Sequence, residues 1–149
     1  MIPLTDAIIR SSIVNASKGA AHRAHLPDLS RVNWDELDYL GWQDPRRPLQ
    51  HYVVLETDGE VRGLMLRGTG QRPPRKLLCA WCQDVVDGNG AATFVAPLAG
   101  SSGRRGNTIP PTSFEMRTED AALLAHYRDQ RIAGLRERSA AFVQAVMSR

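Results

Sequence analysis

The stretch QHYVVLETDGEVRGLMLR, residues 50–67, predicts the centre of the fold. Two runs that are rich in β-branched and large apolar residues flank the dipeptide Asp58-Gly59. This dipeptide is typical of a type I′ turn, because aspartate and glycine tolerate the positive φ angles that such a turn requires. We therefore expect an antiparallel hairpin over residues 50–67.

Upstream of the hairpin, two segments carry the signals of helices. Thr5 is a good N-cap, and the apolar residues after it recur at helical spacing, which predicts a helix over about residues 6–17. In residues 33–42, Asn33 precedes Glu36 by three positions, as in a capping box. This pattern predicts a second, short helix, and the sequence QDPRRP that follows it predicts a turn.

Downstream of the hairpin, the sequences KLLCAWCQDV (76–85), DGNG (87–90) and AATFVAPLAG (91–100) predict a strand, a turn and a strand, with the cysteines at or just after the end of the first strand. Residues 100–113 are rich in glycine, proline and arginine and are expected to be the least structured stretch. A long helix, capped by Thr118, is predicted over about residues 118–147. At about 1.5 Å per residue it would run for roughly 45 Å, which is longer than a compact domain of this size needs.

Together these elements predict one α+β domain over residues 1–149, in which N-terminal helices and a long C-terminal helix pack on an antiparallel sheet. A chain of 149 residues can bury a hydrophobic core without needing metal or disulfides. No apolar run approaches the length of a membrane span, and the N-terminus lacks the pattern of a signal peptide. We therefore expect a cytoplasmic protein that does not bind a membrane.

The charged residues are unevenly distributed along the chain. Residues 28–60 contain eight acidic residues and three arginines, a balance of −5, whereas residues 61–105 contain seven basic and two acidic residues, a balance of +5. Clustered arginine suits an acidic protein or RNA partner, while a solvated basic face is the ordinary interpretation of charge alone. The candidate partner-binding residues of this basic segment are Arg75, Lys76, Arg104 and Arg105.

The two cysteines of the chain, Cys79 and Cys82, have a spacing that lets one turn bring two thiolates to one metal ion. Structural zinc normally has four ligands, so the sequence leaves four interpretations open. The pair is a relic, or it binds zinc with ligands such as His126, Asp84 or Asp87, or two chains share one zinc, or the pair is a redox dithiol. The redox interpretation is the weakest, because such a pair should open a helix, whereas the residues after Cys82 predict a strand or turn.

The other residues with useful chemistry favour structural roles. We expect Trp34, Trp42 and Trp81 in the core, although Trp81, between the cysteines, could instead contact a partner. The spacing of the histidines fits no metal motif based on histidine. The sequence contains none of the phosphate-loop, zinc-protease, nucleophile-elbow or dinucleotide-binding signatures, so we expect no enzymatic activity.

Several segments of the chain together resemble a known family. They are IRSSIVNASKGAA (9–21), LPDLSRVNWDELDYLGWQDPRRPLQHYVV (26–54), LCAWCQDV (78–85), FVAPLAGSSGRRGNT (94–108) and RIAGLRERSAAFVQAV (131–146). They are similar to the treble-clef zinc-finger domain at the C-terminus of elongation factor G-binding proteins, the fusidic acid resistance family, in its short actinobacterial form. The sequences DYLGWQDP and AGSSGRRGNT are the most specific, since neither periodicity nor generic turn chemistry explains them.

The resemblance implies a degenerate treble-clef fold whose finger-like part covers about residues 77–116. In the family, Cys79 and Cys82 would be half of a four-cysteine zinc site. The second cysteine pair would follow an element similar to Gly106-Asn107-Thr108, but this chain has no cysteine there. The resemblance also implies a non-enzymatic protein that binds elongation factor G and promotes its release from the ribosome. The alternative function is that of an RNA- or ribosome-binding module.

Overall fold

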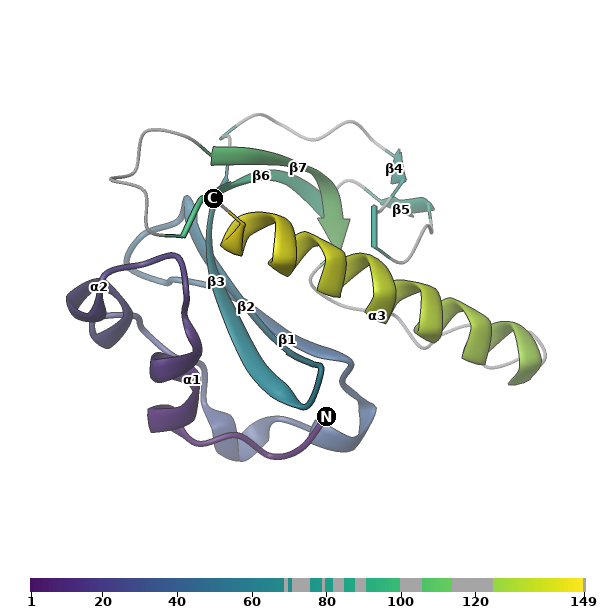
Figure 1. Cartoon of the computed structure of the whole chain (residues 1–149), viewed down its shortest axis with the longest axis horizontal. Coiled ribbons are helices and arrows are strands. Elements are labelled where there is room, and N and C mark those ends of the chain that lie inside the picture. The colour runs from purple at the N-terminus through teal and green to yellow at the C-terminus, as the bar shows by residue number, and fades with distance from the viewer. Residues whose placement is uncertain are drawn as a thin grey trace.

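The computed structural model describes residues 1–68, 70, 76–78, 80–81, 85–87, 91–99, 106–113 and 125–148. Its helices are α1 (Asp6–Ser12), α2 (Lys18–His22), the 3-10 helices η1 (Leu29–Arg31) and η2 (Trp34–Glu36), and α3 (Ala125–Met147). Its strands are β1 (Tyr39–Gln43), β2 (Gln50–Thr57), β3 (Glu60–Gly68), β4 (Lys76–Leu78), β5 (Val85–Asp87), β6 (Ala91–Pro97) and β7 (Gly106–Ser113). Figure 1 shows their arrangement.

The sheet that organises the fold has five strands in the order β1-β2-β3-β6-β7. Every neighbouring pair in it is antiparallel. Strands β4 and β5 form a separate antiparallel pair, which the chain inserts between β3 and β6. The α+β class with an antiparallel sheet, N-terminal helices and a C-terminal helix is therefore confirmed, and it is consistent with a treble-clef domain. No helix in the described part of the chain is long and apolar enough to cross a membrane.

The central hairpin forms as the sequence predicts. Strands β2 and β3 pair continuously, from Gln50 opposite Arg67 to Thr57 opposite Glu60. Asp58 and Gly59 make the turn with φ angles of 53° and 75°. Positive φ at both central positions defines the type I′ turn, whose twist matches that of the strands.

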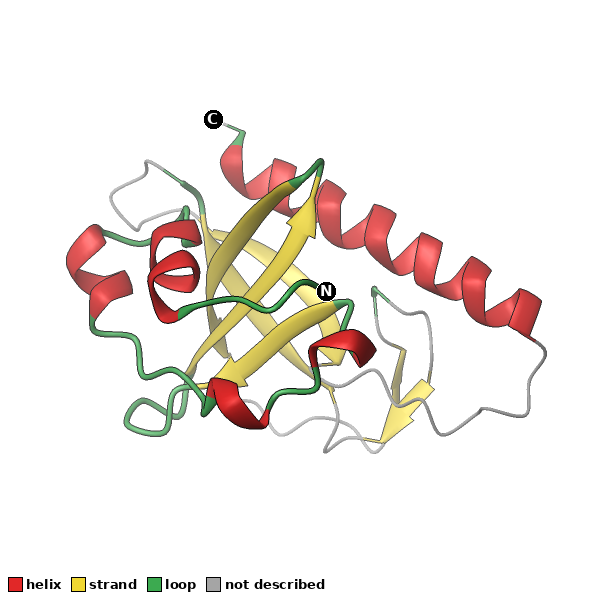
Figure 2. Ribbon diagram, turned by 90° about the horizontal axis from the view of Figure 1, so that it is seen from below, coloured by secondary structure: helices red, strands yellow, loops and turns green. Residues whose placement is uncertain are grey.

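Two hydrophobic cores lie on the two faces of the sheet, and Figure 2 shows the sheet between α3 and the N-terminal helices. Successive side chains of a strand point to opposite faces, so β2 supplies both cores. Val53 and Leu55 lie in the core under α3, while Tyr52 and Val54 lie in the core under α1. The helical residues of the two cores include Leu135, Val143 and Val146 from α3 and Ile9 from α1.

The predicted helix over residues 6–17 is wrong at its C-terminal end. Helix α1 ends at Ser12, because Ile13 forms a parallel bridge with Gly63 of β3 and the Val14 N–H donates to the Gly63 carbonyl at 2.9 Å. Ser17 then caps α2 by accepting from the Ala20 N–H. Pairing with the sheet thus divides the predicted helix into two.

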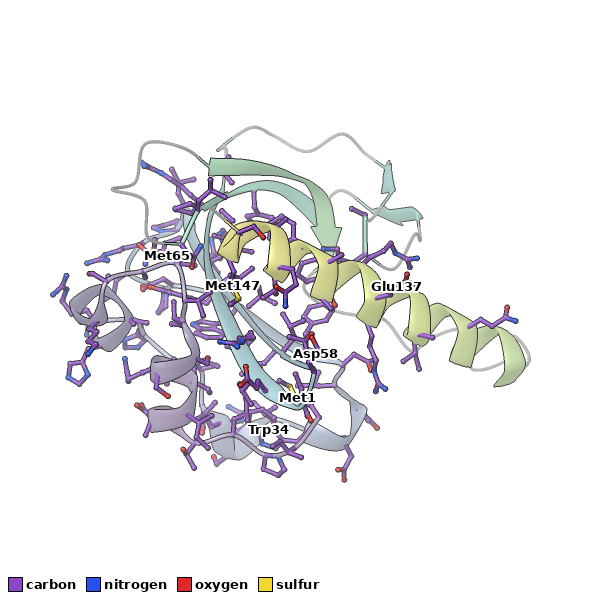
Figure 3. All side chains as sticks on the ribbon, viewed as in Figure 1. Met1, Trp34, Asp58, Met65, Glu137 and Met147 are labelled. Atoms are coloured by element: carbon purple, nitrogen blue, oxygen red, sulfur yellow. The ribbon has the colours of Figure 1, made fainter. Side chains whose placement is uncertain are left out.

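Asn15, in the segment between α1 and α2, joins β3 to β6. Its side-chain amide donates to the carbonyls of Met65 and Pro97 at 2.9 and 3.0 Å and accepts from the Met65 N–H at 2.7 Å. Met65, labelled in Figure 3, lies on β3 beside this segment. Strands β3 and β6 pair only at Arg67 and Gly68, so the Asn15 amide continues the connection beyond the end of their ladder.

The predicted helix over residues 33–42 is also wrong. Only Trp34–Glu36 forms a helical turn, and Asn33 makes no side-chain cap to it. Tyr39–Gln43 is strand β1, which pairs along its whole length with β2. Pairing with β2 overrides the local capping signal, because β1 at the edge of the hairpin buries apolar side chains on both faces of the sheet.

The region after the hairpin differs in part from the prediction. The strand predicted to end at the cysteines is confirmed as β4, which ends at Leu78 and pairs with β5 as a short ladder. The predicted strand over residues 91–100 is confirmed as β6. The predicted start of the last helix, including Thr118, lies outside the described residues, and α3 is described from Ala125.

The expectation that residues 100–113 are the least structured stretch is wrong for residues 106–113. Residues 106–113 form strand β7, at one edge of the sheet. Ala92 and Phe94 of β6 lie opposite Thr112 and Ile109, so the two prolines between them fall at a register shift. Proline lacks an N–H group and is tolerated in edge strands and at bulges. This is why a stretch that contains two prolines can pair at the edge of this sheet.

Candidate functional site

The cysteine segment, residues 79–82, follows β4 and precedes β5 in the chain. Cys79 and Cys82 themselves lie outside the described residues, whereas Ala80 and Trp81 between them are described. Strands β4 and β5 pair on either side of this segment, with Leu78 opposite Val85. In Figures 1 and 2 this strand pair lies on the opposite side of the molecule from α1 and α2.

Trp81 anchors the cysteine segment in the core under α3. Its side chain is only 4% exposed. Its ring lies edge-on to that of Tyr39, with 5.3 Å between centroids and 88° between planes, and 6.2 Å from that of Phe142 on α3. Edge-to-face aromatic pairs of this kind are favourable beyond the area that they bury. The expected core role of Trp81 is confirmed.

The main chain of the cysteine segment is also bound to α3. The Arg138 guanidinium donates from Nε to the carbonyl of Trp81 at 2.7 Å, and Arg138 is half-buried. A charged donor strengthens such a hydrogen bond. Sequence reasoning did not identify Arg138, because a backbone carbonyl 57 residues away leaves no signal in the sequence.

The residues present do not fit the four-cysteine zinc site that the family implies. The chain contains only two cysteines. Among the described residues there is no group of three or more histidine, cysteine or acidic side chains that could hold a metal. Asp84 lies outside the described residues, Asp87 belongs to β5 and His126 to α3. Zinc held by Cys79 and Cys82 with such ligands stays a prediction.

The predicted partner-binding residues lie largely outside the described residues. This holds for Arg75, Arg104 and Arg105, while Lys76 is the first residue of β4. The segment that carries Arg104 and Arg105 is bounded by described residues on both sides. The Ala99 N–H donates to the Val146 carbonyl of α3 at 2.9 Å, and β7 begins at Gly106. Contact between these arginines and a partner stays a prediction.

The other two tryptophans have the packing roles that the sequence suggests. Trp42 is buried and stacks on Tyr52 with 5.1 Å between ring centroids, and its indole N–H donates to the His25 carbonyl at 2.9 Å. Trp34 is partly buried against the same core. Trp42 belongs to the DYLGWQDP sequence, so at least part of that specific motif serves packing.

Acidic residues at the two ends of DYLGWQDP also have structural partners. Asp38 pairs with Arg136 of α3 at 2.9 Å, although Arg136 is largely exposed. Asp44 is buried and accepts from the Arg46 N–H at 2.9 Å. The first contact ties the edge of the sheet to α3, and the second shapes the loop after β1.

The environment of His51 changes its acidity. Its ring lies 4.8 Å from that of Phe94 in the core under α3. Burial lowers the pKa of His51 below its usual value, and a hydrogen bond with the backbone of Leu49 opposes this shift. The position is that of a packed side chain in the sheet, in agreement with the expectation from the sequence.

A comparison with protein families matches residues 8–146 to a model described as the FBP C-terminal treble-clef zinc-finger. No curated protein and no solved structure matches the chain. The matched range begins in α1 and ends in the last turn of α3, so it includes the sheet, most of both cores and the cysteine segment. The chain therefore belongs to the FBP C-terminal treble-clef zinc-finger family.

Proposed function

We propose that this protein binds elongation factor G in the cytoplasm and promotes its release from the ribosome, without catalysing a reaction. Family membership over residues 8–146 is the observation that carries this proposal. The family that the sequence resembles is that of elongation factor G-binding proteins. A ligand shifts a conformational equilibrium only by its differential affinity for the two states, so this protein would bind the released form of the factor more tightly.

The rigidity of the scaffold supports a role in binding. The five-stranded sheet carries a core on each face, and α3 holds the cysteine segment through Trp81 and Arg138. Binding residues on connecting segments work best when a rigid scaffold positions them. The segments that carry Arg75 with Lys76 and Arg104 with Arg105 both adjoin strands of this scaffold.

The direct test is binding to purified elongation factor G. Isothermal titration calorimetry with the full chain should give a dissociation constant in the micromolar range or tighter. A second assay should follow sedimentation of the factor with ribosomes stalled by fusidic acid, where added protein should move the factor to the supernatant. Absence of binding at micromolar concentrations would refute the proposal.

The alternative candidate is an RNA- or ribosome-binding module. The observation that favours it is the net charge of +5 over residues 61–105. Binding to ribosomal RNA through basic side chains weakens steeply as salt rises, because counterions are released. Filter binding to a ribosomal RNA fragment at several salt concentrations would show this slope, and indifference to RNA would exclude the alternative.

A further inference from the structure

The loop between β1 and β2, residues 44–50, is held in one conformation by its own backbone. We call it the arginine loop. The Asp44 N–H donates to the Gln50 carbonyl at 2.8 Å, the Gln50 N–H to the Arg47 carbonyl at 2.7 Å, and the Arg47 N–H to the Asp44 carbonyl at 3.1 Å. The buried Asp44 carboxylate accepts from the Arg46 N–H. These bonds close a compact turn.

Residues at the ends of strands β1 and β3 also donate hydrogen bonds to the arginine loop. The Gln43 side-chain amide at the end of β1 donates to the Pro48 carbonyl at 2.7 Å. The Gly68 N–H at the end of β3 donates to the Leu49 carbonyl, also at 2.7 Å. Pro45 and Pro48 fix their own φ angles. A loop that is ordered before binding loses little conformational entropy when a partner docks.

This rigid loop exposes both positive charge and apolar surface. All residues from Pro45 to Leu49 are exposed. Leu49 is 49% exposed and is one of three large apolar side chains that are exposed among the described residues. Arg46 and Arg47 stand beside it in the chain, and Arg67 on β3 is exposed opposite Gln50. Arginine combined with apolar area is typical of protein–protein contact surfaces.

The charge of the hairpin is divided between its two ends. Glu56, Asp58 and Glu60 lie at the turn, about 20 Å of strand away from the arginine loop at 3.4 Å per residue. Within the loop the only acid is Asp44, which is 3% exposed and turned toward the backbone. The outward-facing charge of the loop is therefore positive, and it complements a negative partner.

The surface favours protein over nucleic acid as the partner. Proteins that bind single-stranded RNA stack bases on exposed aromatic side chains. Among the side chains that the structure describes, no tryptophan, tyrosine or phenylalanine is exposed. The apolar side chain exposed next to the arginines is Leu49, which offers no stacking surface.

We propose that the arginine loop is a docking surface for an acidic, partly apolar protein segment, and that elongation factor G supplies this segment. The inference rests on the proposed function and names the part of this chain that makes the contact. Arg46 and Arg47 pair with carboxylates, for which the guanidinium fork is suited. Leu49 packs against an apolar side chain of the same segment. The loop is distinct from the cysteine segment and from the segment that carries Arg104 and Arg105.

The test compares two charge-reversed variants of the full chain in binding to elongation factor G. Arg46→Glu/Arg47→Glu changes the loop, and Arg23→Glu/Arg31→Glu is the control, since it reverses two exposed arginines elsewhere. The loop variant should raise the dissociation constant by roughly tenfold or more, and the control by less than about threefold. Leu49→Ser should weaken binding by roughly threefold to tenfold without a change of charge.

The circular dichroism spectra and thermal midpoints of all three variants should match those of the wild type. This comparison separates lost binding from lost folding. A loop variant that binds like the control overturns the docking surface and leaves the proposed function intact. A wild type that fails to bind elongation factor G overturns both. A loop variant that loses binding to a ribosomal RNA fragment, but keeps binding to the factor, assigns the loop to nucleic acid and also overturns the inference.

Discussion

Replacement of Trp81 with alanine tests whether the protein core, rather than a metal, holds the cysteine segment. The Trp81 ring is 4% exposed and contacts Tyr39 and Phe142. Truncation of a buried aromatic side chain to alanine costs about 3–5 kcal/mol. A domain of this size is stable by about 5–15 kcal/mol, so the variant should lose a large share of its stability. At roughly 2–4 °C per kcal/mol, its thermal midpoint should fall by about 10 °C.

The assay is urea unfolding followed by far-ultraviolet circular dichroism, with and without EDTA. Trp34→Ala is the matched control, because Trp34 is only partly buried, and it should cost less than Trp81→Ala. Arg138→Ala removes the bond to the Trp81 carbonyl and should cost about 1–3 kcal/mol. The double variant Cys79→Ser/Cys82→Ser should stay within about 0.5 kcal/mol of the wild type.

Two results would contradict this reasoning. One is a loss of less than about 1 kcal/mol in Trp81→Ala, which would show that the ring is not what holds the segment. The other is a wild type that EDTA destabilises as much as the Trp81 substitution does. That result, together with about one zinc per chain in metal analysis, would mean that ligands beyond the two cysteines complete a metal site.

Three further predictions concern the sheet. Gly63→Ala should destabilise the protein by about 1–3 kcal/mol in the same urea assay, because the new methyl group would lie 3.2 Å from the Ile13 backbone nitrogen and 2.7 Å from Ser12 Oγ. Asn15→Ala should cost about 2–4 kcal/mol, since it leaves partly buried backbone groups of β3 and β6 without their bonds to the Asn15 amide. Burial lowers the pKa of His51, so the unfolded chain binds its proton more readily, and stability should fall as pH drops below about 6.5, whereas His51→Gln should lose that part of the pH dependence.

The sequence predicts the central hairpin well because its signals are local. Asp58 and Gly59 specify the turn, and the runs on either side have the composition of strands. The same reasoning failed at residues 33–42, where a capping pattern predicts a helix but Tyr39–Gln43 forms a strand that pairs with β2. It failed again at β7, whose prolines are accommodated by a register shift that depends on β6. Both errors come from contacts between distant segments.

In the candidate site, too, local features could be predicted from the sequence and contacts between distant segments could not. Cysteine spacing identifies the segment at residues 79–82, and the tryptophan inside it is a natural core residue. The bond from Arg138 to the Trp81 carbonyl could not be predicted, since every residue offers the same carbonyl. Neither could the bonds between the Asn15 amide and β3 and β6, because their acceptors are also backbone groups.

Helix α3 binds both the cysteine segment and the residues just after β6. The family resemblance implies a zinc site that joins the first cysteine pair to a second pair after the Gly106-Asn107-Thr108 element, and this chain has no cysteine there. Here Arg138 binds the cysteine segment, and the Val146 carbonyl accepts from Ala99, just before the segment that carries Arg104 and Arg105. The two helical residues are eight positions, or about 12 Å, apart on one helix. Because the cysteine segment and the residues just after β6 are both bound to α3, the position of these two segments relative to one another does not require a metal ion.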